Sequence, residues 1–148
     1  PSGAIVPLSS AAMLRYPLAF MTGHLPVRFT AAERAMLRKY CDRGGLLFVD
    51  DHNHDIDGVF HKTATEELTQ VLGPLQNIAT THPLYRSFFT FQDGPPTTSH
   101  ELNGWGDNLV HDHLQGISEW SFHPENKRFL SVDNTRFGVN LVVYALTR

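Results

Sequence analysis

The stretch Gly44-Gly45-Leu46-Leu47-Phe48-Val49-Asp50-Asp51-His52-Asn53-His54-Asp55-Ile56-Asp57-Gly58 decides the fold of this chain. Four apolar residues follow a glycine pair, which is typical of a strand that is covered on both faces. This strand runs directly into a loop that is crowded with carboxylates and imidazoles. We therefore expect a scaffold that holds this Asp/His loop at the end of a central strand.

A second strand and a helix come before this stretch. The apolar residues 18–21 predict a short strand, which ends at Thr22-Gly23-His24. Thr30 to Glu33 form a capping box that begins a helix, and the glycine pair ends it. Strand, helix and strand in this order predict a βαβ unit with parallel strands. Both strands then end at one edge of the sheet, so His24 and residues 50–55 are expected to open onto one crevice.

Other segments carry helix signals. Ser9-Ser10 cap a helical turn over residues 11–15. Thr63 to Glu66 have the pattern of a second capping box, which predicts a helix that starts there and stops at Gly73-Pro74. Asp133-Asn134 cap a final segment, for which helix is favoured over strand. Between these helices, His82-Pro83 begin a surface turn held by aromatic residues.

Composition narrows the class of protein. The chain has 148 residues, of which 41% are hydrophobic, so a single α/β domain over residues 1–148 with one core is expected. The net charge of -3 gives no basic surface for nucleic acid. No apolar run is long enough to cross a bilayer. Cys41 is the only cysteine, so no internal disulfide forms.

Three segments resemble one known family: residues 16–24, 43–51 and 135–146. Together they are similar to the uncharacterised bacterial family named domain of unknown function 4159 (DUF4159). The resemblance implies a flavodoxin-like, three-layer α/β sandwich with a mostly parallel sheet, similar to class I glutamine amidotransferases. It also implies a bacterial protein of the cell envelope or periplasm rather than the cytoplasm. It implies no particular activity.

The sequence departs from that family in two places. Members usually carry a further apolar strand and a Tyr-Ser-x-x-Asp-like loop after the position of Ile117, whereas here Ser118 is followed directly by Glu119. Members also carry a strand before the position of Pro1. We therefore expect the chain to be incomplete before Pro1 and after Ile117, and the full sheet to be larger.

Glutaminase chemistry does not fit the residues. Such an enzyme needs a cysteine nucleophile on the sharp turn after a central strand. That turn carries Asp50, Asp51 and His52 here, and Cys41 belongs to the preceding helix. The scaffold is therefore expected without the reaction.

A divalent metal is the sharper hypothesis for the Asp/His loop. Imidazole and carboxylate ligands suit zinc, iron(II) or manganese. The candidate ligands are His24, Asp51, His52, His54, His111 and His113. The alternative is a polar loop whose side chains cap helices and bind the backbone, because polar loops usually do this.

Calcium is less favoured than these metals. Asn53 to Gly58 imitate the start of a calcium loop, with oxygen ligands at alternate positions and glycine at the sixth. The twelfth position is Ala64, so the closing bidentate glutamate is missing.

Residues 99–114 hold the remaining candidates. In the Gly-flanked loop, His100 and Trp105 are candidate ligand-binding residues, although a packed anchor is the commoner role of such a tryptophan. Residues 109–114 form either a strand, with His111 and His113 on one face, or a helical turn that separates them. A third possibility leaves both imidazoles in solvent.

Two functions remain open. The first is a binding domain that uses the crevice, with His24, Asp50 and Asp51 as candidate contacts, to hold a small ligand or a protein partner. The second is a metal-dependent hydrolase, in which Asp50, Asp51 or His24 acts as base on a metal-bound water.

Overall fold

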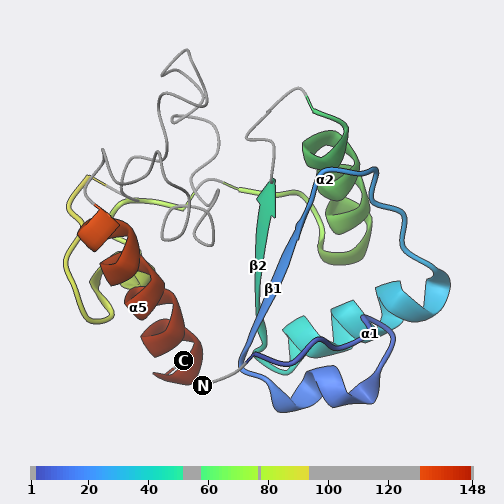
Figure 1. The fold of residues 1–148 in the computed structure, drawn as a ribbon, viewed down its shortest axis with the longest axis horizontal. Helices are drawn as coiled ribbons and strands as arrows, with labels where there is room; N and C mark the ends of the chain where they lie inside the picture. Colours follow the sequence, from blue (N-terminus) through green and yellow to red (C-terminus); the bar gives the residue numbers. More distant parts are fainter. Residues whose placement is uncertain (1–2, 52–57, 77, 94–130, 148) are drawn as a thin grey trace.

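The computed structural model describes residues 3–51, 58–76, 78–93 and 131–147. In chain order its elements are η1 (Ala11–Arg15), β1 (Leu18–Gly23), α1 (Ala31–Asp42), β2 (Leu46–Asp51), α2 (Val59–Leu72), η2 (Pro83–Arg86) and α5 (Ser131–Thr147) (Figure 1). Among these residues no helix combines the length and the apolar character needed to cross a membrane. Helices and strands alternate over the first half of the chain, so the fold is α/β.

β1 and β2 form a parallel pair, as the βαβ prediction requires. The register runs from Leu18 opposite Leu46 to Gly23 opposite Asp51, and both arrows point the same way in Figure 1. α1 supplies the crossover between the two strands. The two strands therefore end together at one edge of the sheet.

α1 begins and ends where the sequence predicts. The Thr30 hydroxyl accepts a hydrogen bond from the Glu33 amide at 3.2 Å, and the Glu33 carboxylate accepts one from the Thr30 amide at 2.7 Å. This reciprocal pair satisfies two amides at the helix start. At the other end, Gly44 adopts a φ of 87°, a conformation that glycine takes without a steric penalty. Both local signals are confirmed.

α2 begins earlier than predicted. Its N-cap is Gly58 and its first helical residue is Val59, so Thr63 lies inside the helix. The prediction of a capping box at Thr63 to Glu66 is therefore wrong. The predicted stop is correct, because Gly73 ends the helix with a φ of 95°.

Two other boundaries or roles differ from the predictions. α5 is a helix, as favoured, but it starts at Ser131, so Asp133 and Asn134 lie within it rather than before it. The segment after His82 forms η2, whose Leu84 and Tyr85 are buried. This segment is a part of the core and not a surface turn.

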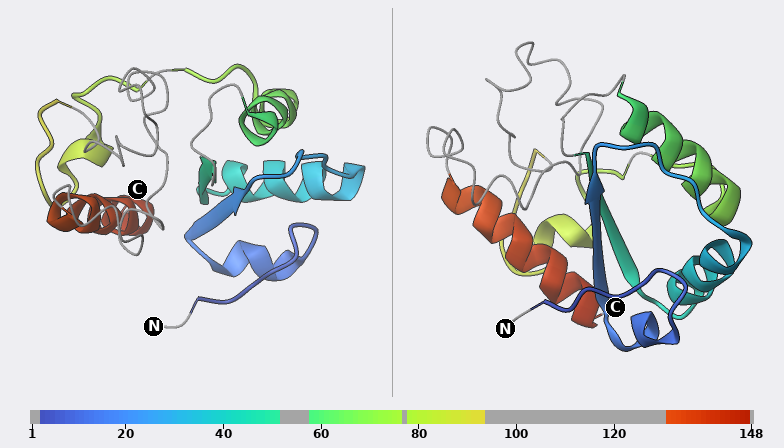
Figure 2. Two further views of the ribbon diagram at one scale, coloured as in Figure 1. Left: turned by 45° about the horizontal axis from the view of Figure 1, so that its top comes forward. Right: turned by 45° about the vertical axis from the view of Figure 1, so that its right-hand side comes forward.

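Alternate strand residues point to opposite faces, so the two-stranded sheet supports two separate hydrophobic clusters. One cluster joins Phe48 to residues of η2 and α5, including Tyr85 and Phe137. The other joins Met13, Leu37, Tyr40, Leu68 and Val71 from η1, α1 and α2, with Ala19, Leu47 and Val49 packed against them. Figures 1 and 2 show α5 on one side of the strands and α1 and α2 on the other.

Candidate functional site

The predicted site residues that the structure describes lie at the carboxyl edge of the sheet. Thr22 lies opposite Asp50, and Gly23 lies opposite Asp51, in the parallel register. His24 follows Gly23 directly and is exposed. The backbone therefore brings the positions of His24, Asp50 and Asp51 to one edge, although what this edge binds stays a prediction.

The other predicted residues lie outside the described residues. These are His52, His54, His100, Trp105, His111 and His113, together with most of the calcium-like stretch from Asn53 to Gly58. Within the part of the chain that the structure describes, no group of three or more His, Cys, Asp or Glu side chains could hold a metal ion. Because most of the predicted ligands lie outside the described residues, the metal site stays a prediction.

The end of β1 packs closely against the start of α2. A Cβ atom added to Gly23 would lie 3.0 Å and 3.2 Å from two carbon atoms of the Phe60 ring. Glycine at this position thus makes room for the ring, which is itself only 5% exposed. This contact places the first turn of α2 beside the candidate site.

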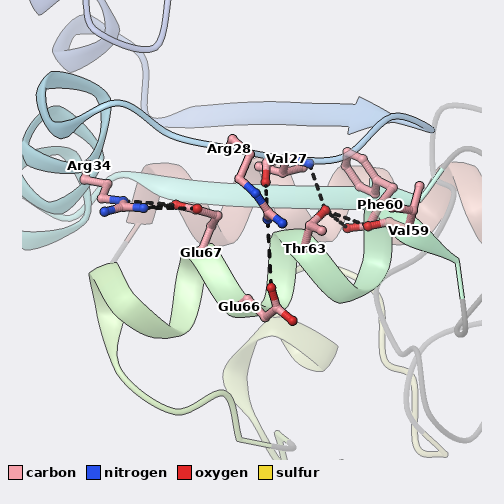
Figure 3. A network of polar contacts seen from close by, with 8 residues as sticks. All are labelled: Val27, Arg28, Arg34, Val59, Phe60, Thr63, Glu66 and Glu67. Atoms are coloured by element: carbon pink, nitrogen blue, oxygen red, sulfur yellow. Dashed lines mark hydrogen bonds and ion pairs between the residues drawn. The ribbon is translucent and has the colours of Figure 1, made fainter.

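Thr63 ties the chain beyond His24 to α2. The Val27 amide donates a hydrogen bond to the Thr63 hydroxyl at 2.8 Å (Figure 3). The same hydroxyl donates to the Val59 carbonyl at 2.6 Å, the bond to the preceding helical turn that threonine makes inside helices. Thr63 has a side-chain contact with a residue 36 positions away in the sequence, instead of the cap that its local pattern predicts.

Two ion pairs continue this contact along α2, as Figure 3 shows. Arg34 of α1 donates from Nε and Nη2 to the two oxygens of Glu67, at 3.0 and 3.1 Å. The Glu67 side chain is only 4% exposed, so this bidentate pair is shielded on the carboxylate side. Arg28 approaches Glu66 at 3.9 Å, with both side chains well exposed. α2 is therefore the helix that locates both the chain after β1 and α1.

His61 is a residue that the sequence reasoning missed. The capping-box pattern predicts a helix that starts at Thr63, so His61 falls before the predicted helix. Because α2 starts at Val59, His61 lies in its first turn, next to Phe60, and is half-buried. The usable signal was the length of the apolar pattern, since Phe60, Ala64, Leu68 and Val71 follow helical spacing.

Two cavities lie away from this edge. One, of about 600 Å³, is apolar and is lined by residues 3–6, by η1 and by four consecutive residues of β1, Leu18 to Met21. Successive strand side chains point to opposite faces, so a cavity lined by all four follows the edge of the strand. The other, of about 300 Å³, includes Arg15 and Arg43 and lies at the amino ends of the strands. Neither contains a predicted site residue.

A protein-family model matches almost the whole chain. The family model described as Domain of unknown function (DUF4159) matches residues 1–146. No curated protein matches the chain. The match covers nearly the whole sequence, including both strands and all the helices described above except the last residue of α5.

Proposed function

The chain belongs to the family described as domain of unknown function (DUF4159), and we propose that it is a binding domain whose site lies at the carboxyl edge of the β1–β2 sheet. This site holds a small ligand or a protein partner, with a divalent metal bound by histidine and aspartate. The observation that carries the proposal is the parallel register of β1 and β2. In this register Asp51 lies opposite Gly23, the residue directly before His24. Parallel α/β sheets bind ligands at this edge.

The scaffold in this proposal is flavodoxin-like. Two features support it: the strands are parallel, and helices pack on both of their faces. Parallel sheets are almost always covered in this way, with connections that place loops at the carboxyl ends of the strands. Asp50 and Asp51 then lie in the last residues of β2 and His24 directly follows β1, so the sheet positions all three.

The position of the cysteine supports binding rather than glutaminase chemistry. Cys41 lies in the last turn of α1, where its carbonyl accepts a hydrogen bond from Gly44 at 2.9 Å. It packs against the cluster of Met13, Leu37 and Tyr40. This location is at the amino end of β2, the opposite end of the strand from Asp51. A thiol there cannot act as a nucleophile on a ligand at the carboxyl edge.

Metal binding to the full-length protein tests the proposal. After treatment with a chelator, the protein is titrated with zinc, iron(II), manganese and calcium in separate calorimetric experiments. We expect one of the first three to bind. At a hundredfold excess over Kd, one bound metal adds about 2.7 kcal/mol of stability, which raises the Tm by roughly 5–11 °C for a domain of this size.

Matched variants locate the metal. Asp51→Asn and His24→Gln should abolish the rise in Tm. Asp42→Asn is the control for the first, because Asp42 pairs with Arg38 on an exposed part of α1. His82→Asn is the control for the second, because asparagine keeps a side-chain acceptor for the Leu84 amide. Metal binding that is unchanged in both site variants would contradict a site at this edge, and an absence of binding by any of the metals would remove metal from the proposal.

A metal-dependent hydrolase is the second candidate, favoured by the exposure of His24 at the strand end. An exposed imidazole can accept a proton from a metal-bound water. A substrate can reach this water from the solvent. The metal-loaded protein should then hydrolyse an activated ester, phosphoester or amide, and His52→Ala should remove the activity. Metal-loaded protein without activity on any of these leaves the binding domain.

A further inference from the structure

We infer that Thr63 is a positioning residue that fixes His24 at the proposed site; this inference rests on the site proposed above. His24 is not anchored by its own strand alone. The residue before it, Gly23, packs against the Phe60 ring, and Val27, three residues after it, is hydrogen-bonded to Thr63. Both anchors belong to the first two turns of α2.

The short connection between the anchors makes this restraint effective. Only Leu25 and Pro26 separate His24 from Val27. The pyrrolidine ring fixes φ at Pro26, and it also restricts the backbone of Leu25. Because this connection is stiff, the hydrogen bond that holds Val27 also restrains the backbone position of His24. One helix, α2, thus contacts the chain both before and after His24.

The Thr63 hydroxyl is suited to this role by its surroundings. The residue is 7% exposed, so water has little access to replace the hydroxyl as acceptor for the Val27 amide. Its bond to the Val59 carbonyl orients the hydroxyl proton along the helix and leaves a lone pair for Val27. Valine has the same shape as threonine but offers no acceptor.

The experiment uses full-length protein with ¹⁵N-labelled histidine, free of metal. In Thr63→Val the imidazole signals of His24, assigned with a His24→Gln variant, should shift, and Thr63→Ser should restore them. The signals of His82, which caps η2, should stay in place in both variants. Thr69→Val is the matched control, because Thr69 is an exposed residue of the same helix. It should leave the His24 signals unchanged.

A merely structural role for Thr63 predicts a different result. If folded Thr63→Val loses stability while the His24 signals stay in place, the inference is overturned. If Thr63→Val does not fold, hydrogen exchange of the wild-type Val27 amide decides. We expect exchange to be slowed by about tenfold or more by the bond to Thr63. Exchange at the rate of an unprotected amide overturns the inference.

Metal binding separates this inference from the proposed function. If the site binds metal, Thr63→Val should weaken the affinity by about tenfold, as the loss of a group that orients a ligand does. Asp51→Asn should remove binding altogether. If the wild-type protein binds no metal while the His24 signals still move in Thr63→Val, the metal site fails and the positioning role stands. If the wild-type protein binds metal but the His24 signals do not respond to Thr63→Val, the metal site stands and the positioning role fails.

Discussion

Arg34 on α1 and Glu67 on α2 form a bidentate ion pair, in which Nε and Nη2 each donate to a separate carboxylate oxygen. The two partners differ in environment, since the Arg34 side chain is 41% exposed and that of Glu67 is 4% exposed. Among the residues that the structure describes, Arg34 supplies both hydrogen bonds to this carboxylate. This pair fixes the crossover helix against the helix that follows the candidate site.

Removing the guanidinium should leave a buried charge without its partner. We expect Arg34→Ala to lower the free energy of unfolding by about 3 kcal/mol, the lower end of the cost of breaking a buried pair. Urea unfolding measures this change. Arg28→Ala is the control, because the exposed Arg28 and Glu66 side chains are 3.9 Å apart and such pairs contribute less than about 1 kcal/mol. Equal losses in both variants would contradict the importance of burial at Glu67.

The turn between α1 and β2 offers a second test, at two adjacent glycines. A Cβ atom on Gly45 would overlap the ring of Tyr40, which is 1% exposed and whose hydroxyl donates to the Leu46 carbonyl at 3.1 Å. The ring has no room to move, so Gly45→Ala should cost about 3 kcal/mol of stability. Gly44→Ala meets no atom within 4 Å, and only its positive φ is strained, at about 1–2 kcal/mol. Urea unfolding that ranks Gly44→Ala as the more damaging change would contradict the packing of Tyr40 on Gly45.

Local sequence signals located the βαβ unit because its boundaries depend on neighbouring residues. The capping box of Thr30 and Glu33 and the left-handed Gly44 each involve residues within a few positions, and both were predicted. Thr63 carries the same local pattern as Thr30, yet its hydroxyl binds Val27. A contact over 36 residues has no signature in a short window, so the capping pattern alone predicted the N-cap of α2 at Thr63, five residues after the observed N-cap, Gly58.

In the candidate site, too, one part can be predicted from the sequence and another depends on long-range contacts. That His24 and Asp51 share one edge follows from topology, because parallel strands joined by a helix end together. Which side chains meet at that edge depends on the packing of α2, through Phe60 against Gly23 and Thr63 against Val27. The periodicity of the sequence does not predict these contacts, because each joins residues that are far apart in the chain.

Asn140 of α5 should be essential for holding η2 and the residues that follow it. The side chain is fully buried; its oxygen accepts from the Phe89 amide at 2.7 Å, and its nitrogen donates to the carbonyls of Leu84 and Phe89 at 2.9 and 2.8 Å. Asn140→Leu removes all three of these hydrogen bonds to the backbone of Leu84 and Phe89, which should cost about 3 kcal/mol or more. Ser87→Ala is the control, since it removes a single hydroxyl, which donates to the Asn140 carbonyl at 2.8 Å and more weakly to the Leu84 carbonyl at 3.4 Å, and it should cost about 1 kcal/mol. Denaturant unfolding of both variants checks the difference, and a loss in Asn140→Leu no larger than in Ser87→Ala would contradict it.

Tyr85 should make the stability of the protein fall at alkaline pH. Burial raises the pKa of its phenol above the ordinary value of 10.0, because the charged form loses solvation in the core. The stabilisation is therefore fully present below the pKa of the unfolded chain and is lost as the pH rises through about 10 toward the higher pKa of the folded state. The Tyr85→Phe variant has no phenol to ionise there, so its unfolding free energy should fall less steeply above pH 10 than that of the wild type. Urea unfolding of both proteins between pH 8 and pH 11 measures the two slopes. Parallel slopes would mean that Tyr85 ionises as readily in the folded protein as in the unfolded chain.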